Sequence, residues 1–323
     1  MPAHATSFQL KKGAATRAAF GDALLELGRE DRRIVVCDAD LSKSTMTHKF
    51  AVEFPERFFS CGIAEANMIG VGAGLASSGK IAFVSSFSCF AINKGFEQLR
   101  VAVAYPEVKN FKVVGTHAGI SIGEDGPSQM AVEDLSLACA LPGFAVLNPA
   151  DEVAMKALVR VAAYHDGPVY IRAGRPPAPI VYNSGQEFHI GGSVELIEGS
   201  DVAILATGLL VAEAIRAAEE LEAAGVSARV IDIYSIKPLD REAIRRAAAE
   251  TGAIVVAEEH LVDSGLGVRV AQAVAELHPA AIEFVGIQNT YAESGTPAGL
   301  LEKYGLVAPN IATAARRALE RKK

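Results

Sequence analysis

The sequence predicts an α/β protein of two domains, each a mostly parallel sheet with helices on both faces. Short, continuously apolar runs, typical of strands buried on both faces, alternate with segments of helical period along the whole chain. The alternation stops once, at residues 176–190, where three prolines accompany no helical period. We therefore expect a first domain at residues 1–175, a linker at 176–190 and a second, smaller domain at 191–323.

Each element follows from these two patterns. In the first domain, apolar runs predict strands at 32–40, 81–87, 111–116, 145–148 and 169–172. Helical spacing predicts helices at 14–27, 65–77, 93–104, 131–140 and 151–165. In the second domain, strands are expected at 201–206, 228–233, 253–257 and 282–286, and helices at 210–224, 240–251, 267–277 and 308–320.

Composition excludes several classes of protein. The 323 residues carry a net charge of -7 and no long basic run, so nucleic acid is not an expected partner. No apolar run reaches the roughly 20 residues of a membrane span, and the start, MPAHATSFQLKKG, lacks the apolar middle of a signal peptide. Cys37, Cys61, Cys89 and Cys139 are far apart and set among apolar residues, as reduced structural thiols are. These features predict a cytoplasmic protein that is not bound to membranes.

One carboxylate stands out at residues 60–79, SCGIAEANMIGVGAGLASSG. Glu65 is the only charged side chain between residues 63 and 76, and it precedes a small-residued helix that is apolar nearly all round and therefore expected to be buried. Glycines inside that helix suggest that another backbone or a ligand approaches closely. Glu65 could simply be an acid that favours the first turn. Alternatively, a carboxyl group buried among apolar neighbours can hold or exchange a proton near neutrality, as a catalytic group does.

Ligands of parallel sheets bind beyond the carboxyl ends of the strands, which directs attention to four segments. These are residues 38–45, 85–90, 117–129 and 172–175. Segment 117–129 is long and glycine-rich, which fits either a functional loop or a solvated turn, and His117 alone could be a structural hydrogen bonder. Phe87 and Phe90 follow two serines, so a ring-stacking platform competes with ordinary core packing.

Several motifs, in order, resemble a known family. They are GIAEANM at 62–68, SSFSCF at 85–90, GEDGP at 123–127 and DGPVYIR at 166–172. This series resembles the pyrimidine-binding domain of thiamine-diphosphate-dependent transketolases. ATG at 206–208 and AEEHLVDSGLG at 257–267 resemble the C-terminal domain of the same family. The resemblance extends from about residue 14 to the C-terminus.

The resemblance implies a cofactor site. Glu65 matches the glutamate that bonds the aminopyrimidine ring of thiamine diphosphate and promotes ionisation of the cofactor. Phe90 and Phe87 match the aromatic residues that stack on or flank this ring, and Asp40 and Ile63 fall beside the cofactor. The activity that these matches imply is transfer of a two-carbon ketol unit from a ketose to an aldose.

The resemblance also implies a substrate site for sugar phosphates. His117 matches a histidine of the substrate channel with a catalytic role, and Asp125 matches an acid that bonds a donor hydroxyl. Arg175 matches the arginine that binds the sugar phosphate, a role that Arg172 could share or replace. Gln129 stands where family members usually have histidine, which indicates an altered sugar specificity. Weaker matches place Arg17 and Ser44 at further phosphate contacts.

The chain has no Gly-Asp-Gly motif with a downstream asparagine, by which the family binds the cofactor's diphosphate and metal. We therefore expect the C-terminal, β-type subunit of a split transketolase. An α-type partner would hold the diphosphate with Mg²⁺ or Ca²⁺, and the assembly would be an α₂β₂ heterotetramer. This chain itself is expected to hold no metal.

Three alternatives remain open on the sequence. The chain could be the β subunit of a 2-oxoacid dehydrogenase or resemble a deoxyxylulose-phosphate synthase, either of which would decarboxylate a 2-oxoacid. It could also be a regulatory or interaction subunit that keeps the fold without chemistry. The GEDGP segment with Phe87 and Phe90 favours transketolase, and Glu65 with Asp125 and Arg175 favours an active subunit.

Overall fold

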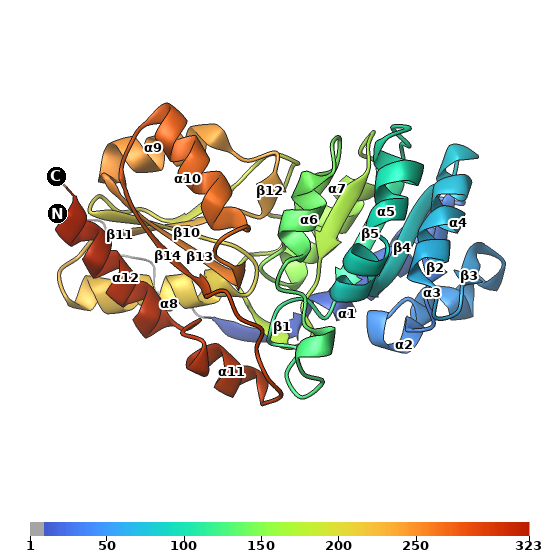
Figure 1. Cartoon of the computed structure of the whole chain (residues 1–323), viewed down its shortest axis with the longest axis horizontal. Coiled ribbons are helices and arrows are strands. Elements are labelled where there is room, and N and C mark those ends of the chain that lie inside the picture. Colours follow the sequence, from blue (N-terminus) through green and yellow to red (C-terminus); the bar gives the residue numbers. More distant parts are fainter. Residues whose placement is uncertain (1–9, 323) are drawn as a thin grey trace.

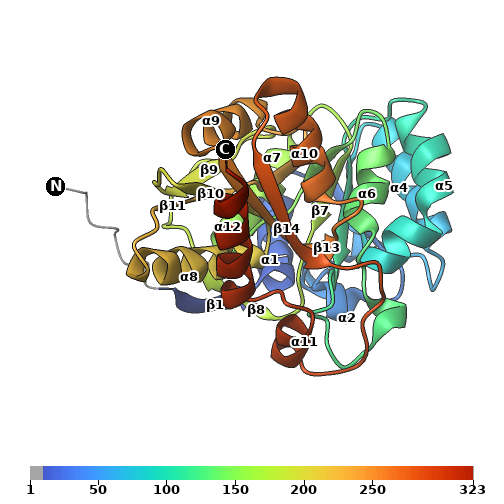
Figure 2. The same cartoon turned by 60° about the vertical axis from the view of Figure 1, so that its left-hand side comes forward.

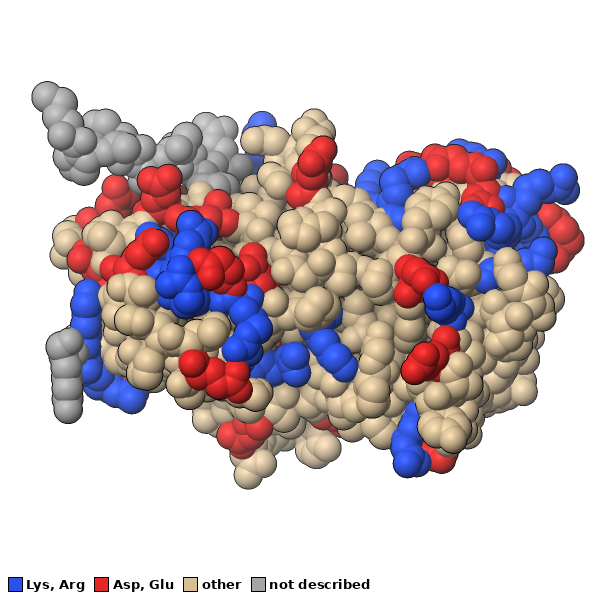
Figure 3. All heavy atoms as spheres, turned by 90° about the horizontal axis from the view of Figure 1, so that it is seen from above, with Lys and Arg blue, Asp and Glu red and all other residues tan. Residues whose placement is uncertain are grey.

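The computed structural model describes residues 10–322, in which two large sheets stand side by side (Figure 1). Residues 1–9, which make up most of the segment expected to lack an export signal, lie outside the described residues. Among residues 10–322, no helix has the length and apolar character that crossing a membrane requires. On the face seen in Figure 3, acidic and basic side chains are interspersed rather than gathered by sign.

The larger sheet has the strand order β12-β6-β7-β5-β4-β2-β3, and its strands run parallel except for β12. Helices α1 and α7 pack together on one face, whereas α4, α5 and α6 cover the other. Short helices α2 and α3 flank α1. The bounds are β2 (Ile34–Asp38), β3 (Phe58–Ser60), β4 (Ile81–Phe87), β5 (Phe111–Thr116), β6 (Ala145–Leu147), β7 (Val169–Arg172), β12 (Ser235–Lys237), α1 (Thr16–Glu30), α2 (Ser42–Thr45), α3 (His48–Glu53), α4 (Glu65–Ser77), α5 (Phe96–Gln98), α6 (Asp134–Ala140) and α7 (Glu152–Ala163).

The second sheet has the order β14-β13-β10-β11-β9, and only β9 is antiparallel to its neighbour. Helices α8 and α12 pack together on one face and α9 and α10 on the other, with α11 below (Figure 2). The bounds are β9 (Val194–Ile197), β10 (Val202–Ala206), β11 (Ala228–Asp232), β13 (Ala253–Leu261), β14 (Ala281–Ile287), α8 (Leu210–Ala223), α9 (Arg241–Thr251), α10 (Leu266–Leu277), α11 (Pro297–Lys303) and α12 (Ala308–Arg321).

The predicted fold class is confirmed, because the central strands are the apolar runs identified in the sequence. Every residue of β2, β4, β5, β7 and β10 is buried, as expected for strands covered on both faces. The apolar side chains form two cores, one on each face of the sheets. Each core draws residues from both halves of the chain, so helices of the two halves share their packing.

The expected division into two separate sheets is wrong at β12. This strand belongs to the second half by sequence, yet it pairs antiparallel with β6 and completes the edge of the first sheet. At that edge, Asn148 N–H donates to the Tyr234 carbonyl, 2.8 Å away. A three-residue strand is too short to reveal its period, so only the folded chain shows this crossing.

The segment expected to be a linker is in fact structured. Within it, β8 (Pro177–Ile180) pairs antiparallel with β1 (Lys11–Ala15) in a separate two-stranded sheet, where prolines are tolerated at an edge. The Asp151 carboxylate accepts hydrogen bonds from the backbone of Val181 and Tyr182, at 2.8 and 2.9 Å. These bonds fasten residues 177–182 to the start of α7.

The helix that begins at Glu65 is not buried all round, contrary to expectation. Of its three glycines, only Gly72 packs tightly, since a Cβ there would lie 2.4 Å from the Val84 side chain. A Cβ at Gly70 or Gly74 would meet nothing within 4 Å, and Ile63, just before the helix, is 79% exposed. We call residues 67, 70 and 74 the outer face of α4; all three are exposed in this chain, and two of them are glycines.

A buried carboxyl group beside the structured segment gives a pH prediction. The Tyr182 hydroxyl donates to Asp232 Oδ2 at 2.6 Å, while Oδ1 has no partner among the described residues. Burial raises the pKa of Asp232 to about 8, far above the roughly 3.9 of an unfolded chain. A folded pKa above the unfolded one adds stability at low pH, and this contribution is lost as the pH rises towards 8.

Asp232→Asn removes this titration. The free energy of unfolding of the variant minus that of the wild type should therefore be at least about 1 kcal/mol larger at pH 8 than at pH 5. Denaturant midpoints of both proteins at the two pH values measure the change. A difference that is the same at pH 5 and pH 8 would show that Asp232 does not titrate with a raised pKa.

Candidate active site

Glu65 is the first residue of α4, and its side chain is turned into the protein. It is 4% exposed, although the residues just before it, Gly62 and Ile63, are exposed. The position in the first turn favours the carboxylate, because helix N–H groups there lack intrahelical partners. Its charged neighbour is Lys94, whose Nζ lies 3.6 Å from Glu65 Oε2. The Glu65 carboxyl group, which the sequence places among apolar neighbours, therefore also lies close to the partly exposed ammonium group of Lys94.

A stack of rings begins on the other side of Lys94. Lys94 Nζ lies 4.5 Å from the centroid of the Phe90 ring. The Phe90 and Phe87 rings are stacked at 5.6 Å, and the Phe87 and His117 rings are stacked at 3.9 Å. One continuous group thus lies at the carboxyl ends of β4 and β5, in which Lys94 links Glu65 to the stacked rings of Phe90, Phe87 and His117. Core packing applies to these rings too, since Phe87 is 5% exposed and lies in an apolar core against which Phe90 packs, and the ring-stacking role stays a prediction.

Wide helical turns place Phe90 and Lys94. The helix expected at 93–104 begins earlier, at Cys89, and residues 89–94 and 99–104 form turns of the π type on either side of α5. Such turns contain more residues than an α-helical turn and are frequent at functional sites. They bring both side chains to the end of β4, beside Glu65.

His117 is held as a neutral imidazole. It lies directly after β5 in a left-handed conformation, with φ of 58°, and its Nδ1 is 2.9 Å from Thr116 Oγ1. Burial, followed by the positive charges of Arg17 and Arg175, lowers the pKa of His117 to about 3. At neutral pH this ring can therefore donate and accept hydrogen bonds but carries no charge.

The two arginines form a positive region next to His117. Arg17 Nη1 donates to the Ser44 carbonyl at 2.6 Å, whereas its buried Nε has no partner among residues 10–322. Burial and the charge of Arg175 lower the pKa of Arg17. Arg175 donates to the Ile122 carbonyl and, at 2.9 Å, to Glu124. A partly buried guanidinium with an unused donor, beside a second arginine, is suited to an anionic group.

The remaining predicted residues lie around this group rather than within it. Asp125 is exposed in loop 117–129, and Gln129 is half-buried at its end, where its carbonyl accepts from Cys89 Sγ at 3.2 Å. Asp40 is exposed after β2 and Ile63 projects outward from the start of α4. The roles of these four residues, like those of the other predicted site residues, stay predictions.

Arg172 does not belong to the positive region, contrary to the idea that it could bind phosphate. Its guanidinium is buried and donates to both oxygens of Asp134, at 2.9 and 3.1 Å, and to the carbonyls of Ala131 and Glu259. Burial disfavours its charge, but the Asp134 carboxylate raises the pKa of Arg172 above its usual value. The two arginines differ in position. Arg172 is the last residue of β7 and lies inside the fold, whereas Arg175 lies beyond the end of the strand.

Sequence reasoning missed three groups of polar residues. Lys94 could not be recognised as a site residue, because it lies in a segment whose sequence pattern is that of an ordinary helix. Asp38, beside the predicted Asp40, is fully buried and accepts hydrogen bonds from the Thr45 and Thr47 hydroxyls and from Leu41 N–H, which shapes the loop after β2. In AEEH at 257–260, the buried Glu259 reaches loop 117–129 from the second half, whereas Glu258 bonds the start of α10; three ionisable residues ending an apolar strand were the available signal.

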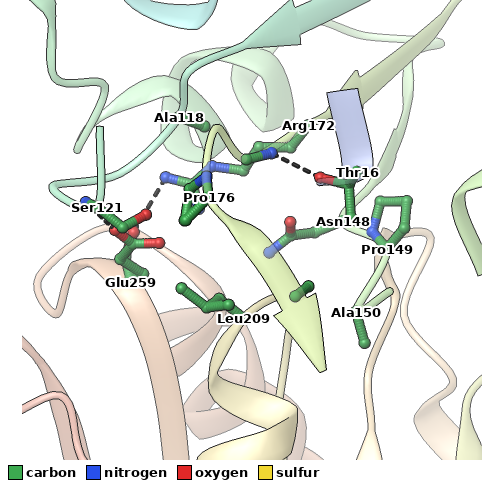
Figure 4. A pocket seen from close by; sticks show the side chains of 12 residues that line it. Thr16, Ala118, Ser121, Asn148, Pro149, Ala150, Arg172, Pro176, Leu209 and Glu259 are labelled. Carbon is green, nitrogen blue, oxygen red and sulfur yellow. Dashed lines mark hydrogen bonds between the residues drawn. The ribbon is translucent and has the colours of Figure 1, made fainter. Parts of the chain in front are cut away.

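A small cavity beside this site is lined by residues of both halves of the chain (Figure 4). Ser121, Arg172 and Glu259 lie along one wall, and the Asn148 amide points in from the opposite side. Leu209, from the second half, lines the cavity too. Side chains of both halves therefore meet directly behind loop 117–129.

Comparison with known proteins identifies the family that this chain matches. The model of the transketolase pyrimidine-binding domain matches residues 12–179, and that of the transketolase C-terminal domain matches residues 192–311. A solved structure described as a split gene transketolase, inactive β4 tetramer, is 48% identical, with a TM-score of 0.90 over 96% of this chain and 100% of that chain.

Two further relatives differ in length. The 6-deoxy-6-sulfo-D-fructose transketolase subunit of Clostridium sp. (strain MSTE9) is 42% identical over 95% of both chains. Human transketolase is 37% identical over 96% of this chain, which spans 50% of the human protein. The matched domains, the identity and the coverage together show that this chain belongs to the transketolase family.

Proposed function

We propose that this chain is the C-terminal subunit of a split transketolase that transfers a two-carbon ketol unit from a ketose phosphate to an aldose phosphate. The observation that carries the proposal is the group at the ends of β4 and β5: the buried Glu65 reaches the Phe90, Phe87 and His117 stack through Lys94. It combines a buried carboxyl group with flat aromatic faces, and an aminopyrimidine ring needs both.

The residues present fit thiamine diphosphate. Glu65 would bond a ring nitrogen of the aminopyrimidine, and Phe90 would lie against the ring, with Phe87 stacked behind Phe90. When bound, the cofactor supplies an electron sink for cleavage of a carbon–carbon bond. The diphosphate and its Mg²⁺ or Ca²⁺ would be held by an α-type partner, since this chain spans only half the length of the human transketolase that it resembles.

This chain's own residues would bind and orient the sugar. Arg175 and Arg17, with Ser44 beside them, would hold the phosphate, because the unused Nε of Arg17 offers a donor to an anion. His117, neutral at physiological pH, would hydrogen-bond the reacting end of the sugar without adding charge. Asp125 and Gln129 would contact hydroxyl groups from loop 117–129 and so contribute to the choice of sugar.

The partner would dock beside Glu65. The outer face of α4 is exposed, and its glycines leave room for another backbone to approach closely. The human relative is about twice as long as this chain, and the solved relative is a tetramer of β chains described as inactive. Both support an assembly, of the α₂β₂ type, in which two kinds of chain are needed for activity.

Reconstitution tests the proposal. This chain alone should show no ketol transfer from a ketose phosphate, because half of the cofactor site is missing. Adding a diphosphate-binding partner chain, with thiamine diphosphate and Mg²⁺, should produce ketol transfer at a rate that saturates as the partner is added. The partner alone is the control. Consumption of pyruvate without ketol transfer by the mixed chains would instead identify a 2-oxoacid decarboxylating enzyme.

A further inference from the structure

The second half of the chain contacts loop 117–129 in two places: Glu259 hydrogen-bonds Ser121, and residues 294–297 pack against Gly123 and Gly126. Ser121 N–H donates to Glu259 Oε1 at 2.6 Å, and both residues are buried. The first half also holds this loop, through the backbone bonds Ala118 N–H to Ala173 O at 3.1 Å and Gly119 N–H to Ala131 O at 2.8 Å. Glu259 therefore fixes the loop at Ser121, between these backbone bonds and the contacts of Arg175 with Ile122 and Glu124.

The backbone of the loop is shaped around this carboxylate. Gly119 has φ of 78°, and a Cβ there would lie 2.2 Å from the Glu259 carboxyl group. Any other residue would therefore collide with Glu259 or force the loop away from it. The path of the loop and the position of Glu259 depend on each other.

Glu259 is itself anchored to the first half. Its carbonyl accepts from Arg172 Nη2 at 3.0 Å, and Leu261 N–H donates to the Val132 carbonyl at 3.0 Å. The end of β13 is thus fastened to the first half at Glu259 and again two residues later. Figure 4 shows Ser121, Glu259 and Arg172 together at the cavity wall. Because the backbone that carries Glu259 is fixed, its side chain can hold the loop in one conformation instead of moving together with the loop.

We propose that Glu259 is a positioning residue for sugar binding, through which the second half of the chain sets the conformation of loop 117–129. This inference rests on the proposed function, in which His117 and Asp125 of this loop contact the ketose. Glu259 touches neither the sugar nor the cofactor. Its effect is to fix where those two side chains stand before the sugar arrives, which lowers the ordering that binding requires.

Two variants of equal length separate the hydrogen bond from simple packing. Glu259→Gln keeps an oxygen that can accept from Ser121 N–H, whereas Glu259→Met fills similar space and offers no comparable acceptor. Glu258→Gln is the matched control. Glu258 is an equally buried acid one residue earlier, but it accepts from Leu266 and Gly267 N–H at the start of α10, inside the second half. Glu259→Ala provides a second acceptor-free variant if the methionine variant does not fold.

The first measurement is hydrogen exchange of residues 119–123 in this chain alone, without turnover. Exchange there should be at least about 10-fold faster in Glu259→Met than in the wild type, and close to the wild-type rate in Glu259→Gln and Glu258→Gln. Equal exchange in Glu259→Met and the wild type would overturn the positioning role, whatever reaction the enzyme catalyses.

The second measurement is ketose KM and kcat in the reconstituted enzyme. Glu259→Met should raise KM about 10-fold while kcat changes less than about 3-fold, because the cost falls on sugar binding. Glu259→Gln should restore KM, and Glu258→Gln should leave it unchanged. Faster exchange with an unchanged KM would overturn the link to sugar binding. Absence of ketol transfer in the reconstituted wild type would refute the proposed function and leave the exchange result standing.

Discussion

Glu65→Gln in the reconstituted enzyme should reduce ketol transfer by about 10²- to 10⁴-fold. Glutamine can still hydrogen-bond a ring nitrogen, but it cannot hold and return a proton as a carboxyl group does. The side chain is 4% exposed, so water cannot easily replace it as a proton donor. Initial rates with a ketose phosphate donor and an aldose phosphate acceptor, at saturating thiamine diphosphate, measure the change.

Glu97→Gln is the control for this result. Glu97 lies in α5, in the same helical segment as Phe90 and Lys94, but its side chain is 62% exposed and turned away to Arg100. The variant should keep wild-type activity. The circular dichroism spectrum and thermal midpoint of Glu65→Gln should match those of the wild type. Full activity of Glu65→Gln would refute the role proposed for this carboxyl group.

Arg172→Met should destabilise the protein by about 3–5 kcal/mol. The substitution leaves Asp134, which is fully buried, without the guanidinium that pairs with both of its oxygens. The Tyr170 hydroxyl, which donates to Asp134 at 2.6 Å, cannot compensate for a buried charge. Burial has already lowered the pKa of the neighbouring His260 to about 4, so that ring does not supply a positive charge at neutral pH. Denaturant unfolding measures the loss.

An exposed ion pair provides the comparison. Lys109 Nζ and Asp166 Oδ2 are 2.6 Å apart, with side chains 62% and 69% exposed, and Lys109→Met should leave the denaturant midpoint close to that of the wild type. Joint replacement of Arg172 by methionine and Asp134 by leucine should recover part of the stability that Arg172→Met loses, because no charge is then left unpaired. If Arg172→Met unfolds like the wild type but binds sugar phosphate poorly, Arg172 is a phosphate ligand after all.

The central strands could be predicted because their buried side chains are consecutive in the sequence. In β2 and β10 every side chain is buried, so the sequence shows an unbroken apolar run with turn residues on either side. The strands that were missed, β1, β3, β8, β9 and β12, have three to five residues and partly exposed side chains or a partner far away in the chain. No local pattern distinguishes such strands from loops.

The candidate site divides in the same way. Glu65 could be found because a single charge among small apolar residues has few structural explanations. Lys94 could not be found, because its approach to Glu65 depends on π-type turns that an α-helical period does not reveal. Arg172 and Arg175 are three residues apart and look equally suited to a phosphate in the sequence. Only the end of β7 separates the buried structural arginine from the one beside His117.

The crossing of β12 into the first sheet has a consequence for any attempt to divide this protein. The two matched family domains meet between residues 179 and 192, which looks like a natural place to cut. A fragment that ends there would lose β12 and leave β6 as an open edge with unpaired backbone groups, a template for aggregation. If the cut is made at residue 179, the fragment also loses Tyr182, whose N–H donates to Asp151. The smallest piece that retains a complete first sheet extends through Lys237, well inside the second homology domain.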